Sequence, residues 1–211
     1  MPASRIHLVR HGEVHNPGGV LYGRLPHFRL SDRGHEMAKL AADSLKSRGV
    51  SVGGIFTSPL QRTQESGAPI EQAFALDAKV DERLIEPFNV FEGRKLSAKT
   101  IAIRPHLVYH LRNPYSPSWG ESYVSIVARM LEAMNDLAAK TDGGDVVIVT
   151  HQAPIWLTHR HLAGEKLAHN PKTRRCSLSS ITTFEKTADG WVEVDYVEPA
   201  IELLAIDKGA V

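Results

Sequence analysis

The amino-acid sequence predicts an α/β protein in which helices cover both faces of a doubly wound, mostly parallel sheet, a three-layer α/β/α arrangement. Short apolar runs alternate with segments of helical periodicity along most of the 211 residues, which is the pattern of such folds. Near the C-terminus, two apolar segments flank Asp189-Gly190, a strong hairpin turn signal that predicts an antiparallel edge. The length suits a single domain over residues 1–211.

The N-terminal part predicts a strand, a long loop and a helix. Residues 6–9 form an apolar run that is typical of a buried parallel strand. The loop that follows, residues 13–30, is rich in Gly, Pro, His and Arg. Ser31 is a favourable N-cap, and the apolar positions after it follow one helical face until Gly49, which suits the C′ position.

A second strand and helix are expected directly afterwards. Residues 54–57 indicate the strand. Ser58 and Pro59 are the residue types preferred at the N-cap and at the first position of a helix. Arg62 would therefore lie in the first turn of that helix.

The rest of the chain contains one irregular stretch between regular elements. Residues 83–121 hold several prolines and no clear periodicity, which favours a lid-like insertion over the active site. Helical spacing over 121–140 and an apolar run over 145–150 indicate a helix and a strand. The remaining elements expected are a helix over 153–163 and the two hairpin strands, 177–184 and 191–197.

The composition excludes several classes of protein. Lys and Arg total 25 against 24 Asp and Glu, so no overall field attracts nucleic acid or a membrane surface, and we expect neither as a partner. The single cysteine, Cys176, cannot form a bridge within the chain. The N-terminal apolar run is too short for a signal peptide, and no run is long enough to span a membrane. We therefore expect a cytoplasmic protein.

Polar signatures follow three of the predicted strands. Arg10 and His11 follow the first strand, Arg62 comes shortly after the second, and His151 follows the third. Because the carboxyl ends of neighbouring strands face one crevice, these side chains can meet there. Guanidinium groups bind phosphate oxygens bidentately, and a neutral imidazole can attack phosphorus. The sequence therefore predicts a phosphoryl-transfer site.

The two arginines would also set the ionisation of the nucleophile. Nearby positive charge lowers the pKa of a histidine, which would keep a lone pair of His11 available at neutral pH. In the transition state, Arg10, Arg62 and a protonated His151 would stabilise the charge on the phosphoryl oxygens.

The motifs that contain these residues resemble a known family. LVRHGEV, YGRLPHFRLSDRG, SPLQRTQ, RLIEPFNVFEG, WGES and VIVTHQ occur in this order and span residues 8–152. They are similar to motifs of the histidine phosphatase superfamily, the phosphoglycerate mutase-like group with the RHG motif. The resemblance implies that His11 becomes transiently phosphorylated and that Arg10, Arg62 and His151 bind the phosphate.

The same resemblance implies further site residues. Glu86 matches the proton donor to the leaving oxygen, although the segment from Glu86 to Gly93 is one residue shorter than the common pattern, so Glu92 stays open as an alternative acid. Asn16 and Gly23 match loop positions that touch phosphate. Gln152, directly after the second histidine, is expected to offer its backbone N–H.

Together these observations favour a metal-independent phosphomonoester hydrolase acting on a small phosphorylated metabolite. No cofactor and no metal are expected, since His159 and His161 lie on opposite sides of a helix. Two alternatives stay open: a phosphotransferase of the phosphoglycerate mutase type, and a catalytically silent protein that binds phosphorylated ligands. The resemblance is also compatible with a homodimer. The basic run around Arg174 is interpreted as a solvated loop or as the rim of the substrate site.

Overall fold

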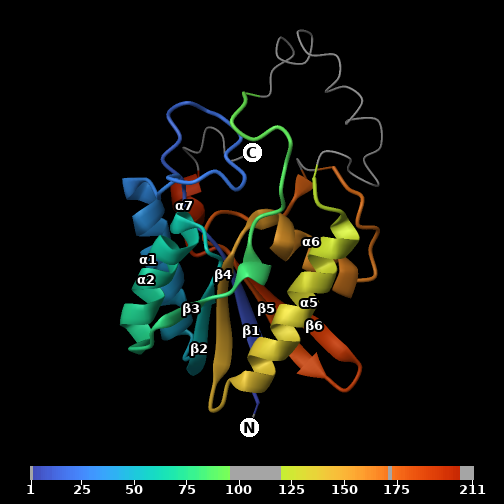
Figure 1. The fold of residues 1–211 in the computed structure, drawn as a ribbon. Coiled ribbons are helices and arrows are strands. Elements are labelled where there is room, and N and C mark those ends of the chain that lie inside the picture. The colour runs from blue at the N-terminus through green and yellow to red at the C-terminus, as the bar shows by residue number, and fades with distance from the viewer. Residues whose placement is uncertain (1, 96–119, 171–172, 205–211) are drawn as a thin grey trace.

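The computed structural model describes residues 2–95, 120–170 and 173–204, and these residues form a six-stranded mixed sheet between helices (Figure 1). The strand order is β3-β2-β4-β1-β5-β6; the first four strands in this order are parallel, and β5 pairs antiparallel with both of its neighbours, β1 and β6. The predicted fold class is thereby confirmed. The strands are β1 (Arg5–Arg10), β2 (Val52–Thr57), β3 (Ala78–Val80), β4 (Asp145–Thr150), β5 (Ile181–Thr187) and β6 (Gly190–Val197).

Helices cover both faces of this sheet. One face carries α1 (Asp32–Ser47) and α2 (Gln61–Phe74), and the other carries α5 (Tyr123–Lys140) and α6 (Gln152–Leu162) (Figure 1). The sequence patterns did not indicate three short elements of the described fold: the edge strand β3, the 3₁₀ turn η1 (Glu82–Leu84) and the helix α7 (Ile201–Leu204).

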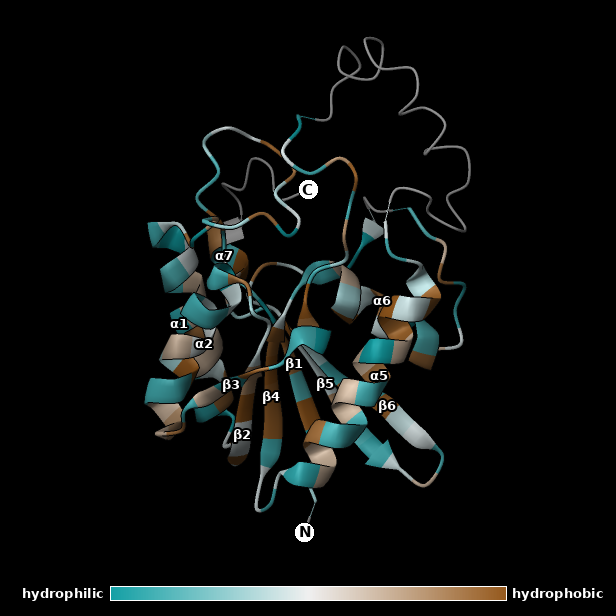
Figure 2. Cartoon of the chain, in the orientation of Figure 1, coloured by the Kyte–Doolittle hydropathy of each residue, from teal (hydrophilic) through white to brown (hydrophobic). Residues whose placement is uncertain are grey.

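The central strand β4 contributes to both apolar layers. Val146 and Ile148 pack into the cluster beneath α5, whereas Val147 and Val149 pack into the cluster beneath α1 and α2. Successive side chains of a strand point to opposite faces, so a strand covered on both sides is apolar throughout. Figure 2 shows this in the hydrophobic colour of most of β4.

The start of α2 differs from the prediction. Its N-cap is Leu60 and its first residue is Gln61, so placing the cap at Ser58 and the first turn at Pro59 was wrong. The Ser58 hydroxyl lies 2.8 Å from a ring nitrogen of His151 instead. Thr63 closes the turn before the helix, because its hydroxyl donates to the carbonyl of Leu60. Arg62 still lies in the first helical turn, as predicted.

Other boundaries follow the sequence patterns closely. The helix after Ser31 is capped by that side chain and is followed by Gly49 with a φ of +71°. The first hairpin strand begins at Ile181 rather than at residue 177, because Ser179 adopts a φ of +55° and turns the chain before the strand. Most of the predicted lid, residues 96–119, lies outside the described residues, so the lid stays a prediction. No helix in the described part of the chain is long and apolar enough to cross a membrane.

Two glycines allow the segment after β1 to lie directly against the first turn of α1. A Cβ at Gly34 would lie 2.0 Å from the carbonyl oxygen of Glu13, and a Cβ at Gly12 would lie 2.3 Å from the carbonyl oxygen of Gly34. Backbone atoms cannot move aside as a flexible side chain can. This contact therefore fixes the chain immediately after the candidate nucleophile, His11.

We expect Gly34→Ala to destabilise the protein by about 1–3 kcal/mol, the usual cost of forcing extra atoms into a packed site. Gly18→Ala is the control, since a Cβ there meets its nearest neighbour, Val20 Cγ1, at 3.8 Å. Its effect should stay within about 0.5 kcal/mol. Urea unfolding measures both values. Equal midpoints for the two variants would contradict this interpretation of the contact.

Candidate active site

The register of three neighbouring strands brings the two predicted catalytic histidines together. In β1 and β4, Arg10 pairs with Thr150, so His11 and His151 are the next residues on adjacent strands. The backbone N–H of His11 donates to the Thr150 carbonyl at 3.1 Å. The two imidazole rings lie 5.2 Å apart between centroids, at an interplanar angle of 63°. The expected convergence at the carboxyl edge of the sheet is therefore present.

His11 has the orientation that a nucleophile requires. Its Nδ1 donates a hydrogen bond to the carbonyl of Gly12 at 2.7 Å, which leaves the lone pair of the ring on Nε2. Burial lowers the pKa of His11 well below its usual range, and the charges of Arg62 and Arg10 lower it further. The imidazole is therefore neutral at physiological pH, as expected from its neighbours.

Arg10 and Arg62, whose charges act on this imidazole, are themselves buried, 6% and 1% exposed. Arg10 Nη1 donates to the carbonyl of Cys176 at 2.6 Å. Arg62 Nη2 donates to the carbonyl of Gly23 at 2.7 Å, and its guanidinium stacks 4.8 Å from the centre of the Tyr22 ring. Each side chain is thus held in one orientation by a backbone carbonyl.

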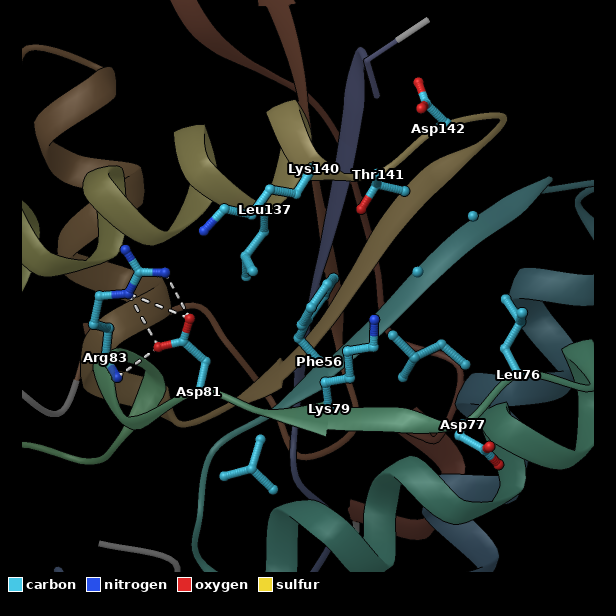
Figure 3. A pocket seen from close by; sticks show the side chains of 14 residues that line it. Phe56, Leu76, Asp77, Lys79, Asp81, Arg83, Leu137, Lys140, Thr141 and Asp142 are labelled. Carbon is cyan, nitrogen blue, oxygen red and sulfur yellow. Dashed lines mark hydrogen bonds and ion pairs between the residues drawn. The ribbon is translucent and has the colours of Figure 1, made fainter.

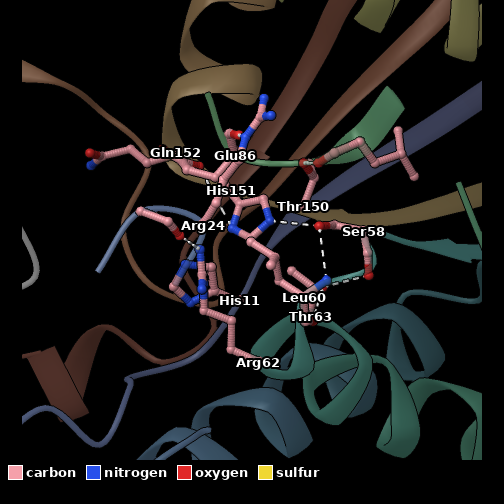
Figure 4. A network of polar contacts seen from close by, with 12 residues as sticks. His11, Arg24, Ser58, Leu60, Arg62, Thr63, Glu86, Thr150, His151 and Gln152 are labelled. Carbon is pink, nitrogen blue, oxygen red and sulfur yellow. Dashed lines mark hydrogen bonds and ion pairs between the residues drawn. The ribbon is translucent and has the colours of Figure 1, made fainter. Parts of the chain in front are cut away.

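His151 lies between β2 and the segment after η1, as Figure 4 shows. Its Nε2 is 2.8 Å from Ser58 Oγ, and its Nδ1 is 3.6 Å from Glu86 Oε2. Burial lowers the pKa of His151 well below its usual range, and nearby positive charges act in the same direction. The protein's own groups therefore favour a neutral His151, not the protonated form that the sequence suggested.

Glu86 is the carboxyl group closest to this pair. Its side chain is 23% exposed, but its Oε2 atom is completely buried and has no hydrogen-bond partner among the described residues. Burial raises the pKa of Glu86, and the charges of Arg62 and Arg174 offset only part of this effect. The environment thus favours the protonated acid, which is the form needed to donate a proton.

Three side chains from separate elements hold the segment that carries Glu86. Arg129 of α5 donates to the Arg83 carbonyl at 2.5 Å, and Thr150 of β4 donates to the Leu84 carbonyl at 2.6 Å. Arg24 donates to the carbonyl of Glu86 itself at 2.5 Å. Glu121 pairs with both Arg129 and Arg24, so the WGES motif supports this arrangement.

The alternative acid, Glu92, lies elsewhere in the same segment. Its Oε1 accepts a hydrogen bond from the backbone N–H of Asn89 at 3.1 Å. It also packs against Gly23, where an added Cβ would lie 2.1 Å from that oxygen. Glu86, rather than Glu92, forms the contact with His151.

The remaining predicted residues lie around the site in different ways. Both polar atoms of the Asn16 side chain bond to the backbone of Val20, so its amide organises its own loop. Gly23 directs its carbonyl, not a donor, towards Arg62. Gln152 is the first residue of α6, and its side chain donates to the Cys176 carbonyl at 3.3 Å.

Unsatisfied polar atoms concentrate at this site. Buried polar atoms in proteins nearly always have a hydrogen-bond partner, so exceptions need an explanation. In the described part of the chain seven buried side-chain atoms have none, and four of them belong to Arg10, Arg62, Glu86 and His151. These atoms are therefore available to form hydrogen bonds with a ligand.

Three residues near the site were not assigned to it from the sequence. Ser58 contacts His151, Tyr22 stacks on Arg62, and Arg174 influences the ionisation of Glu86. The SPLQR motif contained Ser58, but the Ser-Pro pattern favoured a helix cap. The sequence left the basic run around Arg174 open between a solvated loop and the rim of the substrate site, because no periodic pattern placed that residue.

No group of three or more metal-ligating side chains gathers in the described ranges. A separate hollow of about 550 Å³ lies over β2 and β3, where Phe56, Lys79 and Lys140 contribute to its walls (Figure 3). Its arginine, Arg83, is held by Asp81. None of the residues predicted for the phosphoryl site lines this hollow.

Comparisons with known proteins agree with the motifs. The family model of the histidine phosphatase superfamily (branch 1) matches residues 6–199. An uncharacterized protein of Mycobacterium tuberculosis is 45% identical over 93% of this chain and 97% of that protein. The 2,3-bisphosphoglycerate-dependent phosphoglycerate mutase of Thermoplasma acidophilum is 30% identical over 70% of each chain.

Among solved structures, mycobacterial glucosyl-3-phosphoglycerate phosphatase is similar with a TM-score of 0.71 at 24% identity. The match covers 91% of this chain and 97% of that chain, which shows a shared fold. With the family match over residues 6–199 and the fold in agreement, the chain belongs to the histidine phosphatase superfamily.

Proposed function

We propose that this protein is a metal-independent phosphomonoester hydrolase that forms a phosphohistidine on His11 and acts on a small phosphorylated metabolite. One observation carries the proposal: a buried, neutral imidazole with its lone pair on Nε2 lies near two buried guanidiniums whose Nε atoms have no partner among the described residues. Three acceptor oxygens of a phosphoryl group match these donors. Membership of a superfamily of phosphatases and mutases supports the same reaction class.

In the first step, Nε2 of His11 attacks phosphorus while the bond from phosphorus to the ester oxygen breaks. Arg10 and Arg62 donate to the phosphoryl oxygens, and each such donor is worth about 3 kcal/mol in comparable sites. Glu86 gives its proton to the leaving oxygen, so the organic part departs as an alcohol.

In the second step, Glu86 acts as a base. Its carboxylate takes a proton from a water molecule, whose oxygen bonds to phosphorus as the bond to Nε2 breaks. Inorganic phosphate leaves, His11 returns to its neutral form and Glu86 is protonated again. The raised pKa of Glu86 suits both steps, since the acid holds its proton until the leaving group needs it.

The charge of the site favours a phosphate dianion. Two guanidiniums face two neutral imidazoles and an acid that burial tends to protonate, so the local charge is positive. We propose that His151 binds the phosphoryl group together with the arginines, and that the charge of the dianion raises the pKa of His151 in the complex. Asn16, Gly23 and Gln152 stay proposed as surrounding positions, the last through its backbone N–H.

The first test is hydrolysis of p-nitrophenyl phosphate in the presence of EDTA. We expect turnover that survives chelation, and His11→Ala should lower kcat by at least about 10⁴-fold because the nucleophile is lost. Labelled phosphate trapped on the protein should be acid-labile and alkali-stable, and absent from His11→Ala. His35→Ala, which changes an exposed histidine on α1, is the matched control.

Each other result of this test has a definite meaning. Binding of phosphate without turnover would support the silent-binder alternative and overturn the hydrolase. Loss of activity with EDTA would point to a metal enzyme. Label that persists in His11→Ala would remove His11 as the nucleophile.

The second test concerns the acid and its pH dependence. Glu86→Gln should lower kcat/KM for an alkyl phosphate by about 10²–10⁴-fold, but much less for p-nitrophenyl phosphate, whose leaving group needs no proton. Because only the protonated acid works, kcat/KM should be high below the pKa of Glu86 and fall as pH rises through it. Burial places that decline above the ordinary carboxyl range.

Glu92→Gln is the matched comparison, since it removes the other carboxyl of the same segment. We expect Glu92→Gln to keep the alkaline decline for the alkyl phosphate and Glu86→Gln to abolish it. The reverse result would assign the acid to Glu92.

The second candidate function is phosphotransfer of the mutase type, which the 30% identity to the Thermoplasma acidophilum mutase favours. Assays with 3-phosphoglycerate, with and without the corresponding bisphosphate, distinguish the two. A hydrolase should release inorganic phosphate at a rate that the bisphosphate does not increase. Formation of 2-phosphoglycerate without phosphate release would establish the mutase.

A further inference from the structure

A third guanidinium, that of Arg174, lies beside the site and forms no ion pair with the described residues. Arg174 belongs to the segment between α6 and β5, and burial lowers its pKa. It forms no ion pair within the described ranges, whereas its neighbour Arg175 pairs with Glu193 and stacks on the ring of Tyr196. A partly buried charge without an ion pair is costly, so Arg174 differs from Arg175, the other arginine of its segment.

Its hydrogen bonds connect it to the phosphoryl site. Arg174 Nη1 is 3.4 Å from Gln152 Oε1, a long contact, and Gln152 Nε2 donates to the carbonyl of Cys176 at 3.3 Å. The same carbonyl accepts the hydrogen bond of Arg10. Arg174 and Arg10 are therefore linked through Gln152 and one backbone oxygen.

Arg174 lies near the proposed acid. Its partner Gln152 directly follows His151, whose Nδ1 is 3.6 Å from Glu86 Oε2. The charge of Arg174 also lowers the pKa of Glu86, against the effect of burial. In the proposed reaction the acid faces the ester oxygen, so Arg174 lies towards the organic part of the substrate.

The guanidinium is held in one orientation. Its Nε donates to His169 Nε2 at 2.8 Å, and His169 can accept because its Nδ1 donates to the Leu167 carbonyl at 2.6 Å. The His169 ring in turn lies against Tyr123, with 5.8 Å between ring centroids. Nη2 makes no hydrogen bond to the described residues, so it can bind a ligand, and a fixed fork of this kind suits carboxylate or phosphate.

We infer that Arg174 binds a second anionic group of the substrate, a carboxylate or a second phosphoryl group a few bonds beyond the ester oxygen. The inference rests on the proposed function for the identity of the ester, and it narrows the substrate class to phosphomonoesters with a further negative charge.

Binding without turnover tests the inference. In a His11→Ala background, calorimetry compares phosphoglycolate and ethane-1,2-diyl bisphosphate with 2-hydroxyethyl phosphate, which lacks the second charge. Phosphoglycolate carries a carboxylate as its second anionic group, and the bisphosphate carries a second phosphoryl group. Comparing these two ligands shows which of the two groups the protein prefers. We expect the better of them to bind about 10- to 100-fold tighter than 2-hydroxyethyl phosphate, as a charged hydrogen-bonded pair allows.

Three further variants in the same background assign the preference. Arg174→Gln should abolish it while leaving the affinity for 2-hydroxyethyl phosphate within about threefold. Arg174→Lys should keep part of it, because the charge stays but the fork is lost. Arg175→Gln is the matched control, because it removes the same charge from the next residue, whose guanidinium pairs with Glu193. This variant should keep the full preference.

The inference is overturned if the parent protein binds all three ligands equally, or if Arg174→Gln retains the preference. Turnover of the wild-type protein is measured separately. A protein that prefers the doubly anionic ligands but hydrolyses nothing would overturn the proposed function and leave the role of Arg174 standing. Hydrolysis of a phosphomonoester without any preference for the doubly anionic ligands would overturn the role of Arg174 and leave the proposed function standing.

Discussion

The fixed register of β4 between β1 and β2 is the constraint on which the site depends. Ladder hydrogen bonds set Arg10 opposite Thr150 and Thr57 opposite Val149, so the chain leaves three adjacent strands at one level. A shift of one residue would turn the side chains of β4 to the opposite faces and separate the histidines. Since both faces of β4 are packed in apolar clusters, such a shift would also disrupt the core. Core packing and the geometry of the site are thus specified together.

The electrostatic character of the site follows from the depth at which that register places it. Burial disfavours charge on His11, His151 and Glu86, while the two guanidiniums keep theirs. The result is a neutral imidazole at the proposed nucleophile, a carboxyl group that tends to hold its proton, and positive charge near both. Contacts between segments distant in sequence hold these groups together. The Ser66 hydroxyl, for example, accepts a hydrogen bond from the Gly12 N–H and donates one to the Arg62 carbonyl.

The sequence predicted what depends on local pattern, and less of what depends on distant contacts. His11, Arg62 and His151 could be placed because each lies next to an element with clear periodicity. Asn16 could not, since nothing in its neighbourhood shows that both ends of its amide are used by its own loop. The contact of Glu86 with His151 requires carbonyl anchors from three elements, and Ser58 was interpreted as a cap because the same Ser-Pro pattern suits either role. The protonated His151 expected from sequence ignored the energetic cost of burial.

The acid-bearing segment is anchored through its backbone carbonyls at residues 83, 84 and 86, by donors that belong to other parts of the fold. Side chains further along that segment are consequently not required to hold the acid in place. Substitutions between Pro87 and Lys95 would therefore leave these three anchors intact. The position of the Glu86 carboxyl group and the shape of the chain beyond it depend on separate parts of one short stretch.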